Sequence, residues 1–255
     1  MANPDPMLTD PGDLVPEIDL GRAYVFCDFD GTLVDIAPTP DSIDVAGDLA
    51  DTLNRMVKIL DGRFAVVSGR PVPDIERFLP GYTGDIWGAH GAASRRGGTL
   101  KNHPLTGSDA VARLQTAARH VGERHGTLVE MKPTGGVLHY RSKPALEQAL
   151  HAEAVALLAE NEGFELHASK MAWELRPAGA SKGGAVTQEL ADRQPGLIPV
   201  VFGDDVTDEE AMTVAIAEGG FGVRIGGGKT QARFRLKDTA AMRDLLKRII
   251  KETAS

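Results

Sequence analysis

The chain has little cysteine and no long apolar stretch. Cys27 is its only cysteine, so no disulfide can form within the chain, and a reducing compartment is expected. No apolar run approaches the roughly 20 residues that a membrane-spanning helix needs. The N-terminal residues also lack the basic stretch followed by an apolar stretch that marks a secretory signal. The sequence therefore predicts a cytoplasmic protein with no membrane partner.

The chain also lacks an excess of basic residues. It contains 36 Asp and Glu against 28 Lys and Arg, which gives a formal net charge of −8. Nucleic acids and anionic membranes attract clustered Lys and Arg, so we expect neither as the main partner. A small anionic substrate needs only a local positive pocket and stays compatible with this charge. We expect the chain to act as a monomer.

Apolar runs alternate with helical periods in two parts of the sequence. Buried strands are predicted at 23–27, 64–68, 85–89, 198–203 and 221–225. Helices are predicted at 45–60, 75–79, 182–193, 208–218 and 240–251. Strands that alternate with helices indicate βαβ units. The expected fold class is therefore α/β, with a Rossmann-like parallel-sheet core covered by helices on both faces.

The middle of the chain has a different pattern. Helices are predicted at 109–124 and 144–160, and paired strands at 128–132, 136–141, 164–168 and 171–176. This pattern favours a small antiparallel sheet with helices on one face. We therefore expect an inserted α/β cap domain over 104–176 and a core made of 22–103 and 177–255. Residues 1–21 are rich in Pro and Asp and are predicted to be a flexible arm.

Polar clusters follow three of the predicted core strands, and a lysine opens a later helix. Asp28 and Asp30 follow the strand at 23–27, and Ser68, Gly69 and Arg70 follow the strand at 64–68. Asp204, Asp205 and Asp208 follow the strand at 198–203, and Lys182 is the lysine at the start of the helix. The carboxyl ends of parallel strands meet at one edge of a sheet, where ligands bind. Carboxylates that face one another need a hard cation, and all-oxygen ligands suit Mg²⁺. The sequence therefore predicts one magnesium-dependent site.

The residue types at this site suit phosphoryl transfer. Asp28 is ionised at neutral pH and can attack phosphorus as a nucleophile. Asp30, two residues later, can protonate a leaving oxygen and then take a proton from the attacking water. Lys182 and Ser68, beside helix N-termini, provide for an anion such as phosphate.

Four motifs in order, DFDGTL, SGR, GASKGG and GDDVTDEEAM, resemble those of the haloacid dehalogenase superfamily. The resemblance implies that Asp28 forms an aspartyl-phosphate and that Asp30 is the acid and base. It implies that Ser68, Gly69 and Lys182 hold the phosphoryl group. It also implies a Mg²⁺ site made by Asp28, Asp30, Asp204 and Asp205, with Asp208 as an alternative to Asp205. In such sites the second Asp, here Asp30, usually offers its backbone carbonyl rather than its side chain. The late acid that is not a ligand would orient Lys182.

The resemblance extends over most of 22–250, where the sequence is similar to the trehalose-6-phosphate phosphatase family. The matching segments include IWGAHGA, VEMKPTGGVLHYR and WELRPAGASKGGAV. The resemblance implies a Mg²⁺-dependent phosphatase whose cap recognises the sugar through Glu130, Lys132 and Glu174. It also places the loop of His90 beside the substrate, and Arg70 either contacts the substrate or braces its loop by ion pairing.

Simpler interpretations of the same residues stay open. The late acids can be helix N-terminal charges that the helix dipole favours. Glu130, Lys132 and Glu174 can be ordinary cross-strand charges on a wet sheet face. The same chemistry can serve a sucrose-, glucosylglycerol- or mannosylglycerate-type phosphate. A non-catalytic binding module on the same fold is the alternative from another class.

Overall fold

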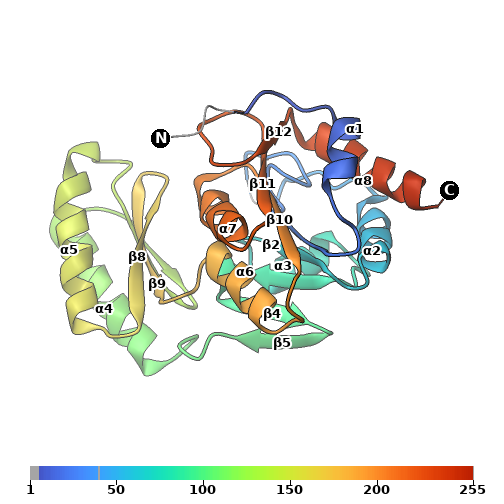
Figure 1. Ribbon diagram of the computed structural model, residues 1–255. Coiled ribbons are helices and arrows are strands. Elements are labelled where there is room, and N and C mark those ends of the chain that lie inside the picture. Colours follow the sequence, from blue (N-terminus) through green and yellow to red (C-terminus); the bar gives the residue numbers. More distant parts are fainter. Residues whose placement is uncertain (1–5, 40, 255) are drawn as a thin grey trace. The chain divides into compact units, whose positions relative to one another are not determined.

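The computed structural model describes residues 6–39 and 41–254, and the chain divides into two compact units. The first unit comprises Met1–Lys101 and Ser181–Ser255, and the second comprises Asn102–Ala180. The second unit is therefore an insertion in the chain of the first (Figure 1). Within the described ranges, no helix combines the length and the apolar content that crossing a bilayer requires.

The first unit contains a mostly parallel sheet, as the sequence predicts. In the described part of the chain its order is β12-β11-β10-β1-β2-β3-β4-β5. The parallel strands are β1 (Ala23–Cys27), β2 (Phe64–Val67), β3 (Asp85–Gly88), β10 (Ile198–Gly203), β11 (Phe221–Ile225) and β12 (Phe234–Leu236). Next to β3, β4 (Ala93–Arg96) runs antiparallel and is followed by β5 (Thr99–Asn102). The sequence reasoning missed β4, β5 and β12.

Helices cover both faces of this sheet because successive residues of its strands point in opposite directions. From β1, Val25 and Cys27 pack into one apolar cluster, and Tyr24 and Phe26 pack into the other. The first cluster takes side chains from α1 (Pro11–Leu14), α2 (Leu49–Ile59), α3 (Val72–Phe78) and α8 (Thr239–Thr253). The second takes them from α6 (Lys182–Ala191) and α7 (Val206–Ala217). The parallel-sheet core with two covered faces is thus confirmed.

The N-terminal segment differs from the flexible arm expected over 1–21. Residues 1–5 lie outside the described part, but α1 and the 3₁₀ turn η1 (Val15–Glu17) are formed. Leu14, Val15 and Ile18 are buried in the first apolar cluster. Their spacing places three apolar side chains on one side of a short helical stretch. The high Pro and Asp content of the segment masked this pattern.

The second unit is a four-stranded antiparallel sheet in the order β6-β7-β9-β8. Its strands are β6 (Val129–Lys132), β7 (Gly135–His139), β8 (Phe164–Ser169) and β9 (Ala172–Pro177). Two helices, α4 (Asp109–His125) and α5 (Glu147–Glu160, after the turn η3, Pro144–Leu146), pack on one face of the sheet (Figure 1). The opposite face carries charged side chains, among them Glu130, Glu174 and Arg176.

Candidate active site

Three neighbouring strands of the first sheet bring the predicted motifs to one edge. β1 lies between β2 and β10, and Cys27 is in register with Val66 and with Phe202. The backbone N–H of Asp28 donates to the carbonyl of Phe202 at 2.9 Å. Parallel strands in this register end together, so the residues that follow them project from the same edge of the sheet.

Lys182 connects two acids from opposite ends of the sequence. It is the first residue of α6, whose N-cap Ser181 accepts a hydrogen bond from the backbone of Gly184. Its Nζ donates to Oδ1 of Asp28 and to Oδ1 of Asp208, at 2.6 Å in each case. A cation at a helix N-terminus opposes the helix dipole. The two carboxylates offset this cost, which indicates a specific role for the ammonium group.

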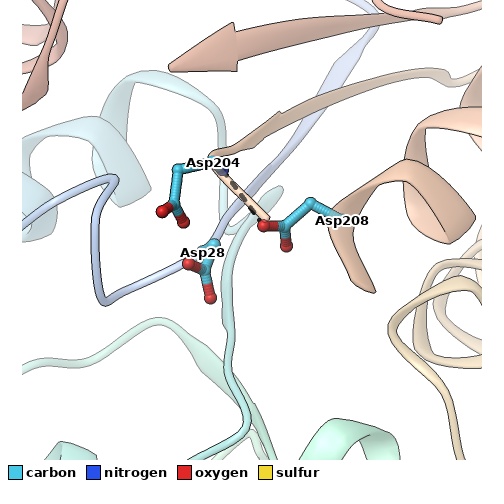
Figure 2. Close-up of side chains that lie close together, drawn as sticks. All are labelled: Asp28, Asp204 and Asp208. Atoms are coloured by element: carbon cyan, nitrogen blue, oxygen red, sulfur yellow. Dashed lines mark hydrogen bonds between the residues drawn. The ribbon is translucent and has the colours of Figure 1, made fainter. Parts of the chain in front are cut away.

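Asp28, Asp204 and Asp208 form a carboxylate group (Figure 2). One oxygen from each lies within 4.8 Å of the others. Gly31 allows Asp204 to approach the turn after Asp28, since a Cβ at Gly31 would lie 2.2 Å from Oδ2 of Asp204 and φ there is +79°. The glycine in this turn therefore allows the acidic motif at Asp28 and the acidic motif at Asp204 to lie side by side. We call these three residues the carboxylate group below.

The structure distinguishes Asp205 from Asp208, which the sequence left as alternatives. The carboxylate of Asp205 accepts from the backbone N–H of Val206 at 2.7 Å and caps α7. Oδ2 of Asp208 accepts from the backbone N–H groups of Asp204 and Asp205, at 3.1 Å and 2.9 Å. Asp208 therefore both joins the carboxylate group and orients Lys182. The expected ligand Asp205 lies outside the group found in the described residues.

The side chain of Asp30 forms an ion pair with Arg70, which leaves the backbone carbonyl expected at the metal untested. Nε of Arg70 lies 2.6 Å from Oδ2 of Asp30, and a second guanidinium nitrogen lies 2.7 Å from Oδ1. The guanidinium group also lies 5.9 Å from the ring centre of Phe29 and 5.1 Å from that of Phe78. The hydrogen bonds that Arg70 donates to the carboxylate of Asp30 raise the pKa of Arg70. Of the two roles expected for Arg70, the ion-pairing one is observed.

Burial and neighbouring charge shift the pKa values of this site. Burial, and then the charge of Asp208, raise the pKa of Asp28 well above its usual range. The same two causes raise the pKa of Asp204 to about 6. Burial alone would lower the pKa of Lys182, but the charges of Asp208 and Asp28 raise it. Without further positive charge, the site thus binds protons at Asp28 and Asp204 more tightly than an exposed carboxyl would, while the ammonium stays charged.

These shifts test whether a divalent cation fits the site. Three carboxylates face one ammonium group, so the fully ionised site would carry an excess of two negative charges. A divalent ion would balance that excess and favour the ionised forms of Asp28 and Asp204. The oxygen ligands are of the kind that Mg²⁺ prefers. The carboxylate group is therefore a candidate metal site whose chemistry fits Mg²⁺.

The remaining core residues lie in two adjoining loops. Ser68 is buried after β2, and its hydroxyl accepts from the backbone N–H of Arg70 at 3.1 Å. The carbonyl of Ser68 accepts from the backbone N–H of His90 at 3.0 Å, which joins this loop to the 3₁₀ turn η2 (Ala89–Gly91). Ala89 and His90 both have positive φ, 49° and 54°. Two successive non-glycine residues in this region are strained, as is common at functional sites.

The three sugar-binding candidates share the polar face of the second sheet. Glu130 is in register with Val137, and Val137 with Glu174, so their side chains point to the same side. Nζ of Lys132 donates to Oε1 of Glu174 at 3.0 Å. Glu130 contacts the ring of His139 at 3.2 Å. We call Glu130, Lys132 and Glu174 the sheet-face triad.

Comparisons with known proteins show which family the chain is similar to. A family model described as trehalose-phosphatase matches residues 26–240. The chain is 34% identical to trehalose-6-phosphate phosphatase of Escherichia coli over 232 residues, which cover 90% of this chain and 86% of that protein. It is also 34% identical to a probable trehalose-phosphate phosphatase of Sinorhizobium fredii, covering 82% and 79%. A solved trehalose-6-phosphate phosphatase structure from Aspergillus fumigatus has the same fold, with a TM-score of 0.78 at 21% identity over 98% of this chain and 100% of that one.

Proposed function

The chain belongs to the trehalose-phosphatase family, and on this basis we propose that it hydrolyses trehalose 6-phosphate to trehalose and inorganic phosphate. The observation that supports a working enzyme best is the position of Lys182. Its Nζ lies 2.6 Å from both Asp28 and Asp208. This position brings together the nucleophile Asp28, the ammonium group of Lys182 that can bind phosphoryl oxygens, and the carboxylate group. All of them belong to the first unit.

In the first step, a carboxylate oxygen of Asp28 attacks phosphorus. The bond between phosphorus and the sugar oxygen breaks, and Asp30 gives a proton to that oxygen. In the second step, water attacks the phosphorus of the aspartyl-phosphate, Asp30 takes a proton from it, and the carboxylate of Asp28 is released. Arg70 holds the carboxylate of Asp30 through two contacts. Asp30 must therefore leave this ion pair when it carries the proton.

The remaining side chains bind the substrate. Lys182, Ser68 and the backbone at Gly69 hold the phosphoryl oxygens. Asp28, Asp204 and Asp208 would hold Mg²⁺, which when bound neutralises the carboxylates and offsets the charge of the phosphoryl group. The strained turn at His90 adjoins the Ser68 loop, which supports a contact with the substrate.

Recognition of the sugar is assigned to the second unit. The sheet-face triad offers two carboxylates and one ammonium group on one polar face, and these groups can bind neighbouring hydroxyls. A buried hydroxyl left without a partner costs about 1–3 kcal/mol, so convergent polar groups are needed to select a sugar. In this proposal the first unit is the catalytic core and the second is the cap. Action as a monomer in the cytoplasm stays a prediction.

A phosphate-release assay tests the proposal. The purified chain is incubated with trehalose 6-phosphate and with sucrose-, glucosylglycerol- and mannosylglycerate-type phosphates, with Mg²⁺ or with a chelator. We expect the highest kcat/KM for trehalose 6-phosphate, its loss with the chelator, and its return on adding Mg²⁺. Preference for another sugar phosphate would reassign the substrate, and no release from any of them would refute a phosphatase.

A further inference from the structure

A second buried charged cluster lies in the first unit, on the same helix that begins with Lys182. Glu189 on α6 is fully buried. Its Oε2 accepts from the indole N–H of Trp87 at 3.0 Å and lies 2.9 Å from Nε of Arg96. Its Oε1 accepts from Arg96 at 3.2 Å and from Nε of Arg193 at 2.9 Å. One carboxylate thus ties α6 to β3 and β4.

The position of this cluster relative to Lys182 follows from helix geometry. Glu189 comes seven residues after Lys182, which is close to two turns, so both side chains lie on the same face of α6 about 10 Å apart along the axis. The start of the helix is held as well: a Cβ at Gly91 in η2 would lie 2.6 Å from the carbonyl oxygen of Ser181. The continuous segment of β3, η2 and β4 therefore braces both ends of α6.

The first turn of α6 has few side chains that could fix its rotation. Lys182 is followed by Gly183, Gly184 and Ala185, which offer little or no side chain to pack. Yet Nζ of Lys182 must lie 2.6 Å from two separate carboxylates. A rotation of about 20° would move an atom at the rim of a helix of about 6 Å radius by about 2 Å. Close packing at the start of the helix, where a Cβ at Gly183 would lie 3.1 Å from the carbonyl oxygen of Glu210, and contacts further along the helix together prevent such a rotation.

We propose that Glu189 is a positioning residue for Lys182: its buried contacts with Trp87, Arg96 and Arg193 set the rotation of α6 and so place the Lys182 ammonium between Asp28 and Asp208. A buried ion cluster can often be replaced by apolar side chains without loss of stability. Removing one member alone, in contrast, leaves buried charges without a partner and is destabilising. Stability therefore does not require a charged cluster at this position, and we assign it a geometric role. The inference rests on the proposed function only in taking Lys182 as a phosphate-binding residue.

The test compares Glu189→Leu with Asp192→Asn as the matched control. Asp192 contacts the same Arg96 at 2.6 Å, but its side chain is 51% exposed, so the control removes a partner of Arg96 and leaves Glu189 in place. The probe is inorganic phosphate, whose affinity is measured by titration calorimetry with Mg²⁺ present, together with kcat and KM for an aryl phosphate. Neither readout depends on which sugar the enzyme prefers. A failure here is therefore distinguishable from a failure of the proposed substrate.

We expect Glu189→Leu to weaken phosphate binding about tenfold and to lower kcat about 10- to 100-fold, since misplacing a catalytic group by about 1 Å costs up to about 10²-fold. Asp192→Asn should change both by less than about twofold, as expected for a partly exposed pair. Circular dichroism and thermal unfolding identify a temperature at which both variants are folded. Unchanged phosphate affinity and kcat in folded Glu189→Leu would overturn the proposal.

A double-mutant cycle distinguishes positioning from a general structural role. If Glu189 acts through Lys182, Glu189→Leu should cost much less in a Lys182→Arg background than in the wild type. Equal losses of phosphate affinity in both backgrounds would overturn the proposal. If Glu189→Leu does not fold, Glu189→Gln takes its place, because it keeps the size of the side chain and an acceptor for Trp87 but removes the charge. Glu189→Gln should likewise cost much less phosphate affinity in the Lys182→Arg background than in the wild type.

Discussion

The side chains of Lys182 and Asp28 in the first unit are buried, whereas two members of the sheet-face triad, Lys132 and Glu130, are partly open and the third, Glu174, is buried. The side chains of Lys182 and Asp28 are 5% and 6% exposed, but those of Lys132 and Glu130 are 33% and 51% exposed. Electrostatic interactions are stronger where water is excluded, which suits a reaction that moves charge. Partly hydrated side chains can adjust to the hydroxyls of a sugar. The contrast indicates fixed geometry for chemistry and adaptable contacts for recognition.

Replacing the nucleophile should give the largest effect and would show that all chemistry belongs to the first unit. We expect Asp28→Asn to lower kcat for trehalose 6-phosphate and for an aryl phosphate alike, by at least about 10⁴-fold. Steady-state assays check the rate, and circular dichroism checks the fold. Asp205→Ala is the control, since Asp205 caps α7 and its loss should cost about 1 kcal/mol of stability but little turnover. Retained activity in Asp28→Asn would refute the assigned nucleophile.

A stability measurement tests whether the N-terminal segment belongs to the core of the first unit. Leu14 is fully buried, so Leu14→Ala should lower the free energy of unfolding by about 2–5 kcal/mol. Leu8 is 63% exposed, and Leu8→Ala should change the same quantity by less than about 0.5 kcal/mol. Urea denaturation gives both values. Equal values for the two variants would mean that the segment contributes nothing to the core.

A substitution in the sheet-face triad should separate recognition from chemistry. We expect Glu174→Ala to raise KM for trehalose 6-phosphate by about 5- to 150-fold, which corresponds to about 1–3 kcal/mol for lost hydroxyl contacts. Hydrolysis of an aryl phosphate, which has no sugar to bind, should be unchanged. Arg124→Ala is the matched control, because Arg124 pairs with Glu153 away from the triad. An equal loss on both substrates would assign Glu174 to the chemistry instead.

The smallest expected effect is a pH dependence of protein stability that arises from the carboxylate group. The pKa of Asp204 is raised to about 6, so the folded state without metal binds this proton more tightly than the unfolded state does. Stability from this residue is therefore present at low pH and is lost as pH rises through about 4 to 6. Mg²⁺ competes with the proton. The rise in Tm on adding Mg²⁺, measured by calorimetry, should be larger at pH 7.5 than at pH 5, and the reverse order would contradict this prediction.

Much of the fold could be predicted from hydrophobic patterns. The strands at 198–203 and 221–225 match β10 and β11, and the helix at 109–124 matches α4 within one residue. β4 and β5 were missed because ASRR and TLKN are mostly polar: these strands lie at the edge of the sheet and carry no continuous apolar run. The short strand β12 was missed because Leu236 is its only buried apolar residue, which is too little to indicate a strand.

The site could be predicted only in part. The motif order placed Asp28, Lys182 and Asp204 together, because strand ends converge whatever the length of chain between them. The roles of Asp205 and Asp208 depend on which of their carboxylates caps α7. The sequence GDDVTDEE does not specify the side-chain conformations that decide this. A capping box, with an acid at the N-cap and another three residues later, is the signal that could have assigned Asp205 to the cap. The pair of Asp30 and Arg70 needs tertiary structure to be seen.

The order of the strands has a consequence for how the chain is made. β1 pairs with β10, so Cys27 obtains its neighbour Phe202 only after the whole second unit has left the ribosome. At about 5–20 residues per second, synthesis of the roughly 170 intervening residues takes about 10–35 s. During that time the strand next to the nucleophile has one edge whose backbone N–H and C=O groups are unpaired, and its apolar side chains are incompletely covered. Newly made chains should therefore depend on chaperones at this stage.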